Sequence, residues 1–161
     1  MIKKRRGFTL VELLIVMAVI AILIGIAIPA FRGMQQEARK TKAEGDVRVL
    51  KIAVESYYKN NGKYPFPNAT ACKTFNISWE NLLTGATPKI LEAVLNDPFS
   101  SGASSQYSYA LSSDTQTSAN YYVILSVGMD ATRDITGINN TSGSPEGSVD
   151  DDIYETNGIR Q

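Results

Sequence analysis

The chain has 161 residues, and its sixteen basic side chains balance sixteen acidic ones. This length fits one domain with an appendage and argues against a multidomain enzyme. Histidine is absent, which excludes histidine-dependent hydrolases, imidazole zinc sites and imidazole pH switches.

The amino terminus is basic and is followed by a long apolar run. Residues 1–7 hold four cations and no acid, and residues 13–31 carry no charge over nineteen positions. At about 1.5 Å per residue, this run is long enough to cross a hydrocarbon core of roughly 30 Å. Because positive flanks stay cytoplasmic, we expect a single membrane span with its amino terminus inside and the rest of the chain outside.

A cleavable secretory signal is the competing interpretation, since it also combines a basic start with an apolar run. The small residues at 25–27 offer a cleavage point, and a secreted binding domain starting near Ile28 would result. The run exceeds the usual length of about 7–15 residues. Glu12 also interrupts the apolar stretch, and a charge in a membrane helix costs about 2.5–3.5 kcal/mol and needs a partner.

The segment KKRRG (residues 3–7), then FTLVE (residues 8–12) and the apolar run resemble the leader and first helix of type IV pilins and type II secretion pseudopilins. The resemblance implies that a prepilin peptidase cuts between Gly7 and Phe8 and methylates the new amine of Phe8. It further implies a homo-oligomeric filament built from the bacterial inner membrane, with an assembly platform there and minor pilins or pseudopilins as other partners.

Cleavage gives Glu12 a physical role. In parallel helices shifted along their axes, the cationic amine of Phe8 in one subunit can meet the carboxylate of Glu12 in another. An ion pair within one chain is the alternative, because Phe8 and Glu12 are separated by four residues.

The helix is expected to continue beyond the membrane, from Phe8 to about Asn60. Residues 32–60 place apolar side chains at spacings of three and four, namely Ala43, Val47, Leu50, Val54 and Tyr57. Pro29 removes a backbone donor and clashes with the carbonyl of Gly25, which makes this turn a soft point. It either kinks the membrane helix or melts when subunits pack.

Four segments follow from these patterns: a cleaved leader (1–7), a membrane and assembly helix (8–31), its amphipathic continuation (32–60) and a globular domain (61–161). The segment YYKNNGKYP (57–65) ends the helix and also resembles the helix end of the family. Short helical turns are expected at 79–83 and 90–95. Strands are expected at 106–109, 121–126 and 152–155. The fold class is therefore α+β, with the second half of the long helix packed on a small antiparallel sheet of about three strands, which is the type IV pilin fold.

Three further motifs, at 97–99, 126–130 and 150–153, resemble the major pseudopilin of type II secretion. That resemblance implies a calcium site formed by Asp130, Asp150 and Asp152 with the backbone carbonyl of Val127, and oxygen ligands of this kind suit calcium. Nineteen residues separate Asp130 from Asp150, which is longer than the family pattern. A solvated acidic loop is the alternative.

The sequence thus favours a structural filament subunit, the major pseudopilin of a periplasmic type II secretion pseudopilus. The alternative is the major pilin of a surface pilus, used for adhesion, motility or DNA uptake. An enzyme is not expected, because no nucleophile, base or phosphate-binding loop accompanies the acidic residues. Without residues 1–7, twelve bases face sixteen acids, so no nucleic-acid partner is expected either.

Overall fold

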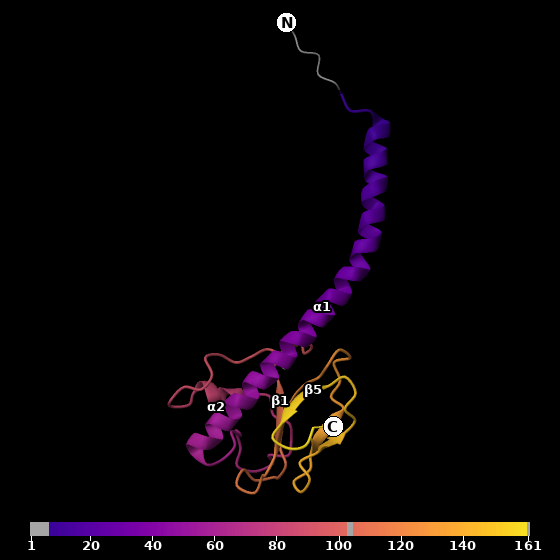
Figure 1. The fold of residues 1–161 in the computed structure, drawn as a ribbon. Coiled ribbons are helices and arrows are strands. Elements are labelled where there is room, and N and C mark those ends of the chain that lie inside the picture. The colour runs from indigo at the N-terminus through magenta and orange to yellow at the C-terminus, as the bar shows by residue number, and fades with distance from the viewer. Residues whose placement is uncertain (1–6, 103–104, 161) are drawn as a thin grey trace. The chain divides into compact units, whose positions relative to one another are not determined.

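The computed structural model describes residues 7–102 and 105–160. The chain divides into two compact units, Met1–Glu37 and Ala38–Gln161. Helix α1, Leu10–Asn61, begins in the first unit and ends in the second (Figure 1). The second unit therefore combines the later turns of α1 with the sheets.

Helix α1 begins and ends within two residues of the predicted limits. At its carboxyl end, Gly62 has a φ of 67°, and its N–H donates to the carbonyl of Tyr58 at 2.7 Å. Glycine adopts this left-handed conformation at little cost, which makes it the common residue after a helix. The turn that follows Asn60 therefore ends the helix as predicted.

Three strands form the main sheet of the second unit. They are β1 (Ser108–Leu111), β2 (Tyr122–Ser126) and β5 (Ile153–Thr156), antiparallel and in the order β1-β2-β5. Every residue of the central strand β2 is buried, because both faces of the sheet are covered. This confirms the predicted sheet and the α+β class.

The later turns of α1 cover one face of this sheet. The buried residues of α1 are Ala43, Val47, Leu50, Ala53 and Val54. They share a core with Trp79, whose ring stacks on Tyr109 with the centroids 4.4 Å apart. The indole Nε1 of Trp79 donates to the carbonyl of Tyr107 at 2.9 Å, so its polar atom is satisfied in the core. The amphipathic pattern of the helix thus reports a real packing face.

A β-hairpin covers the other face. It consists of β3 (Ile135–Ile138) and β4 (Pro145–Gly147), which pair antiparallel. Ile135 and Ile138 are buried in a second cluster with Val123 and Leu125 of β2. The sequence predicted only a long connection here. Since alternate residues of β2 point to opposite faces, its second apolar face requires a cover that α1 cannot provide.

The two predicted helical turns have different outcomes. The first is confirmed as α2 (Glu80–Thr84), whereas the prediction of a helical turn at 90–95 is wrong. The N–H groups of Ile90 and Leu91 both donate to the carbonyl of Leu83 at 3.3 Å, so this segment is a loop tied to the end of α2. Short apolar runs do not distinguish a helix from a loop that feeds the core.

Candidate assembly and cation sites

The first candidate site lies at the start of α1. The N–H and hydroxyl of Thr9 donate to Glu12 Oε2 at 2.9 and 2.8 Å, and the N–H of Glu12 donates to Thr9 Oγ1 at 3.2 Å. This reciprocal pair is a capping box, which satisfies backbone donors at the helix start. Thr9 was missed in the sequence, although the spacing Thr-x-x-Glu is the signal for this motif.

The expected pairing of Glu12 with an amine stays a prediction. In the uncleaved chain Phe8 carries a peptide N–H and no free amine. Gly7 and Phe8 precede the first helical turn and both are exposed. A Cβ built on Gly7 would meet no other atom within 4 Å. The bond between these residues therefore lies outside α1, and no packing against it is seen among the described residues.

The apolar segment after the capping box is exposed in the part of the chain that the structure describes. None of the residues 10–31 is buried, and the exposed fraction is 87% for Leu10 and 61% for Phe31. By length and composition, α1 is able to cross a membrane. The helix continues through Gly25 and Pro29, so melting of this turn on assembly stays a prediction.

The second candidate site is a group of carboxylates in the second unit. Asp130, Asp134 and Asp151 each offer one oxygen, and these three oxygens lie within 4.8 Å of one another. We call these three residues the acidic cluster. Of the four residues predicted to bind calcium, only Asp130 belongs to the acidic cluster. The other two members are Asp134 and Asp151, and the predicted ligands Asp150 and Asp152 are not among them.

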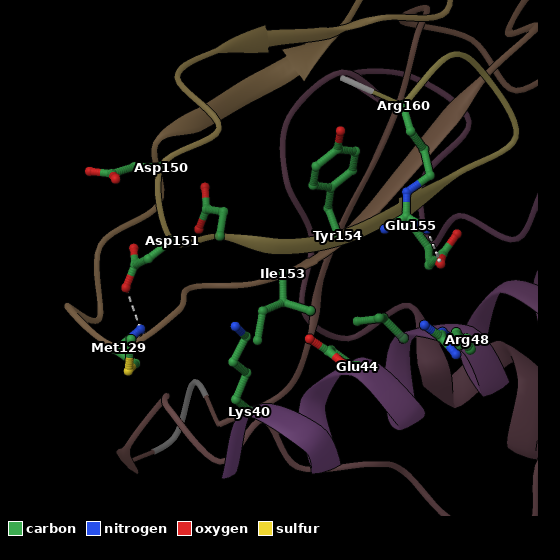
Figure 2. Close-up of a pocket in the computed structure, with 12 residues that line it drawn as sticks. Lys40, Glu44, Arg48, Met129, Asp150, Asp151, Ile153, Tyr154, Glu155 and Arg160 are labelled. Carbon is green, nitrogen blue, oxygen red and sulfur yellow. Dashed lines mark hydrogen bonds and ion pairs between the residues drawn. The ribbon is translucent and has the colours of Figure 1, made fainter. Parts of the chain in front are cut away.

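Asp151 shapes the turn that carries the cluster. Its Oδ2 accepts the N–H groups of Met129 and Asp130, the latter at 2.9 Å. Gly128 has a φ of 68°, and a Cβ there would lie 2.5 Å from the carbonyl oxygen of Asp151. In Figure 2, Asp151 reaches toward Met129 while Asp150 points away from it. The close approach at Gly128 places Asp151, not Asp150, against the loop.

Asp152 has an anchoring position. It is only 7% exposed, and its Oδ2 accepts the N–H groups of Asp134 and Ile135 at 2.9 and 2.8 Å. Burial raises the pKa of Asp152. It therefore fixes the start of β3 and holds Asp134 next to the other two carboxylates.

Asp130 and Val127, two other residues of the predicted calcium site, also form local hydrogen bonds. The hydroxyl of Thr132 donates to Asp130 Oδ2 at 2.6 Å, and the N–H of Thr132 donates to Asp130 Oδ1 at 2.8 Å. These hydrogen bonds, the first more than the second, lower the pKa of Asp130. The N–H of Val127 donates to Asp97 Oδ2 at 3.2 Å. The loop is thus ordered by its own contacts, with Asp130 ionised at neutral pH.

The acidic cluster fits a divalent cation in its donor chemistry. Three carboxylates supply hard oxygens of the kind that calcium prefers. Asp151 Oδ1 is buried and has no hydrogen-bond partner among the described residues. Like charges this close repel each other unless a cation or proton compensates them. The residues present are therefore able to hold such an ion.

A cleft of about 400 Å³ adjoins the cluster and is shown in Figure 2. Its charged residues come from α1 and from the end of the sheet, and they are Lys40, Glu44, Arg48, Asp150, Asp151, Asp152, Glu155 and Arg160. The described lining contains no serine, threonine, cysteine or histidine. An activated nucleophile of those types is therefore missing from the described walls, and mixed charge of this kind suits binding better than covalent catalysis.

The amino-terminal segment matches a known family. The family described as "Prokaryotic N-terminal methylation motif" matches residues 2–28. The chain is 40% identical over 67 residues to the type IV major pilin protein PilE1 of Neisseria gonorrhoeae, covering 42% of this chain and 41% of that protein. It is 37% identical over 65 residues to the type II secretion system core protein G of Escherichia coli K12, covering 40% of this chain and 45% of that protein.

A third relative is the type IV major pilin protein PilA of Myxococcus xanthus, 39% identical over 61 residues, which are 38% of this chain and 28% of that protein. The chain spans less than half the length of these relatives. No solved structure gives a significant match. The names are those of filament and secretion proteins, not of enzymes, in line with the expectation from the sequence. In its amino-terminal motif the chain is thus similar to the type IV pilins and to the type II secretion core protein G, and its long helix on a small antiparallel sheet agrees with the type IV pilin fold.

Proposed function

We propose that the chain is the repeating subunit of a helical filament of the type IV kind. The observation that carries this proposal is the uncovered apolar surface of residues 10–31, which contains a single carboxylate, that of Glu12. An exposed apolar surface of this extent needs a membrane or other copies of itself as cover. Parallel helices of neighbouring subunits supply that cover in the filament and bring an amine to Glu12.

Processing creates the cation that the assembly uses. A prepilin peptidase cuts between Gly7 and Phe8, and methylation of the new amine leaves its positive charge in place. The capping pair of Thr9 and Glu12 lies wholly after the cut, so the helix keeps its start. Before assembly, α1 anchors the subunit in the inner membrane with its amino terminus in the cytoplasm, where an assembly platform and minor pilins or pseudopilins are its further partners.

As the specific setting we propose the periplasmic pseudopilus of type II secretion. The similarity to a type II secretion core protein and the acidic cluster near β5 support this setting. The surface pilus is the second candidate, favoured by the comparable identity to type IV major pilins. Deleting the gene separates the two, because loss of a pseudopilin blocks protein secretion, whereas loss of a pilin removes filaments that can be sheared from the cell surface.

Mass spectrometry of the membrane-bound protein tests the processing step. We expect a mature chain that begins at a methylated Phe8. Gly7→Leu should leave full-length precursor, because a bulky side chain blocks the residue before the cut, while Gly7→Ala is the milder control. A mature chain beginning near Ile28 would show a secretory signal instead and end the filament proposal.

Paired substitutions test the assembly step. Glu12→Gln keeps the size of the side chain and removes its charge, so we expect normal processing and membrane insertion with loss of filaments. Thr9→Ala is the matched control, since it removes the capping hydroxyl and keeps the carboxylate, and it should still assemble. Normal filaments from Glu12→Gln would contradict the intersubunit ion pair. Equal losses from both variants would assign Glu12 to helix capping alone.

We also propose that the acidic cluster binds calcium. The support comes from three adjacent carboxylates and a buried, unpartnered Asp151 Oδ1. Calcium at a hundredfold excess over its Kd would add about 2.7 kcal/mol to the free energy of unfolding, and magnesium less, because it holds its waters. The measurement is the melting temperature of the full chain in detergent, with chelator and with millimolar calcium.

Variants then identify the calcium ligands. Asp134→Asn should abolish the calcium-dependent rise in melting temperature, because its oxygen belongs to the cluster. Asp150→Asn is the matched control and should keep the rise, since Asp150 lies outside the cluster. Equal melts of the unaltered chain with chelator and with calcium would leave a solvated acidic loop.

A further inference from the structure

Glu80 is a carboxyl group sealed inside the second unit at the start of α2. Its side chain has no exposed surface. Oε2 accepts the N–H of Leu95 at 2.7 Å, and Oε1 has no hydrogen-bond partner in the part of the chain that the structure describes. A buried carboxylate with an unsatisfied oxygen is costly unless it takes up a proton.

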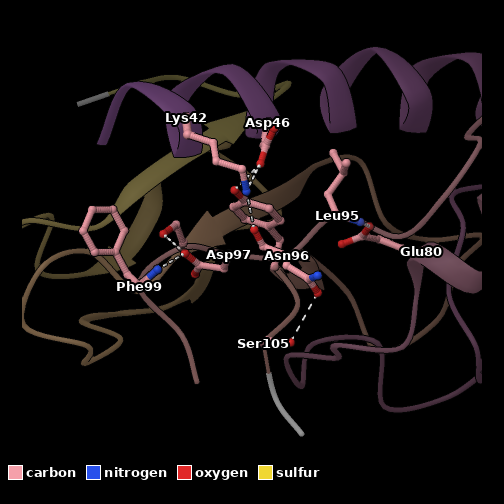
Figure 3. A network of polar contacts seen from close by, with 10 residues as sticks. Lys42, Asp46, Glu80, Leu95, Asn96, Asp97, Phe99 and Ser105 are labelled. Carbon is pink, nitrogen blue, oxygen red and sulfur yellow. Dashed lines mark hydrogen bonds and ion pairs between the residues drawn. The ribbon is translucent and has the colours of Figure 1, made fainter. Parts of the chain in front are cut away.

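Among the described residues, no cation is found in the set of groups that shift the pKa of Glu80. On α1, Lys42 Nζ lies 3.3 Å from Asp46 Oδ2 and donates to the carbonyl of Asn96 at 2.9 Å. Next to β1, the hydroxyl of Tyr107 donates to Asp46 at 2.8 Å. Figure 3 shows Lys42 and Asp46 beside the segment that follows Leu95. The ammonium group of Lys42 is therefore engaged by Asp46 and by a backbone carbonyl.

The protonation of Glu80 reflects this setting. Burial raises its pKa to about 7, the hydrogen bond from the backbone N–H of Leu95 opposes that shift, and the negative charge of Asp46 adds to it. A proton on Oε1 leaves Oε2 free to accept from Leu95. The neutral acid thus fits the observed contact, whereas the ionised form leaves a charged oxygen without a partner.

Glu80 holds one end of a short strap, which we define as residues 95–97. Each residue of the strap is bound by a different element: Leu95 by Glu80 of α2, and the carbonyl of Asn96 by Lys42 of α1. The carboxylate of Asp97 accepts the hydroxyl of Ser126 in β2 at 2.7 Å. The strap therefore links α1 and α2 to the central strand β2, and Glu80 is its anchor on α2.

We propose that Glu80 is a proton-dependent lock between α2 and the strap. The neutral acid keeps the lock closed, and loss of the proton on mild alkalisation weakens it. This device belongs to the second unit and does not rest on filament assembly.

The direction of the pH effect follows from the folded and unfolded forms. In the unfolded chain Glu80 ionises near its ordinary pKa of 4.5, while the folded form keeps its proton to higher pH. The contribution of Glu80 to the free energy of unfolding is therefore largest below about pH 4.5, the pKa in the unfolded chain. It falls between that pH and the pKa of the folded form, and it is constant at higher pH. In that interval the folding equilibrium constant falls by up to about tenfold per pH unit.

Thermal unfolding of the full chain in detergent tests the lock. Trp79, the single tryptophan, lies in the core beside Glu80 and reports unfolding of the second unit. Between pH 5 and pH 8 we expect the melting temperature of the unaltered chain to fall by on the order of 5 °C. Glu80→Gln, which has nearly the same shape and does not titrate, should remove most of that fall.

A matched control and a second measurement complete the test. Glu92→Gln removes an exposed carboxylate and should leave the fall unchanged. If Glu80→Gln does not fold, infrared spectra of the unaltered chain with isotope-labelled glutamate give the answer. A neutral carboxylic acid band from glutamate should persist at pH 6 and vanish by pH 8.5. Its absence at pH 6, or a fall in Glu80→Gln equal to that of the unaltered chain, would overturn the proposal.

Discussion

The two parts of α1 contain the same kinds of apolar residue, yet only the later part has buried side chains. None of the residues 10–37 is buried, whereas Val47, Leu50 and Val54 are at most 1% exposed. In the second unit the apolar positions form one stripe that meets Trp79 and the sheet. In the first unit they surround the helix on all sides, and such a helix needs apolar surroundings that the described chain does not supply.

This difference separates two sources of stability. The second unit is held by packing within the chain, so truncating its core side chains should lower its melting temperature. The first unit depends on a membrane or on other copies, so equivalent changes there should alter insertion or assembly and leave that melting temperature alone. Substitutions of the same type in the two parts of one helix therefore test the comparison directly.

The largest effect is expected from Leu50→Ala, because Leu50 has no exposed surface. Removing a buried leucine side chain costs about 2–5 kcal/mol, as lost transfer free energy plus a cavity. Leu23→Ala is the matched control, since Leu23 is 61% exposed. Trp79 fluorescence during denaturant unfolding of the full chain measures both. A comparable loss from Leu23→Ala would mean that the two parts of α1 are not independent.

An intermediate effect is expected from Glu155→Gln. The carboxylate of Glu155 is 7% exposed and lies 3.1 Å from Lys51 Nζ of α1 and 3.0 Å from Arg160 Nη1. Hydrogen bonds to charged groups contribute about 1.5–3 kcal/mol each, but both cations here can regain water, so we expect a loss of about 1–2 kcal/mol. Glu37→Gln, an exposed acid of the first unit, should change the unfolding free energy negligibly. Urea unfolding at two salt concentrations checks the ionic origin of the loss.

The smallest effects are expected from substitutions of two glycines, one of which should lower and the other raise the free energy of unfolding. Gly62→Ala places a Cβ at a positive φ and should destabilise the second unit by about 1 kcal/mol. Gly45→Ala lies within the helix, where a Cβ meets no atom within 4 Å, and should stabilise by up to about 1 kcal/mol. Gly25→Ala, in the first unit, should leave the same melt unchanged. If Gly45→Ala lowers the free energy of unfolding instead, Gly45 has a packing contact that is not seen in the described structure of one chain.

Much of the fold follows from local patterns in the sequence. The apolar stripe through Val47 and Leu50, the turn at Gly62 and the alternation around Ile124 each reflect one face packed on one core. The hairpin of β3 and β4 was not predicted, because the signal around Ile135 is short and set among polar residues. The loop at Ile90 was mistaken for a helix since its apolar residues reach the core without helical geometry.

The candidate sites show the same division. Thr9 was within reach, because its spacing to Glu12 is a known capping signal. The membership of Asp134 in the acidic cluster could not be predicted from the sequence. It depends on the hairpin that brings the chain back to Asp151 and on the hydrogen bonds by which Asp152 holds the start of β3. Three consecutive aspartates also point in different directions, and sequence does not show which one faces the loop.

The order of strands in the sheet has a consequence for biosynthesis. Strand β2 pairs with β1 on one side, but its other neighbour, β5, follows only after the whole β3–β4 hairpin. A nascent chain that has emerged only as far as β4 therefore shows an unpaired edge of β2, and such edges recruit foreign strands. Pairing over this sequence separation is also slow compared with local hairpin closure. The interval before Ile153–Thr156 emerges is thus the stage at which a chaperone has a defined target on this protein.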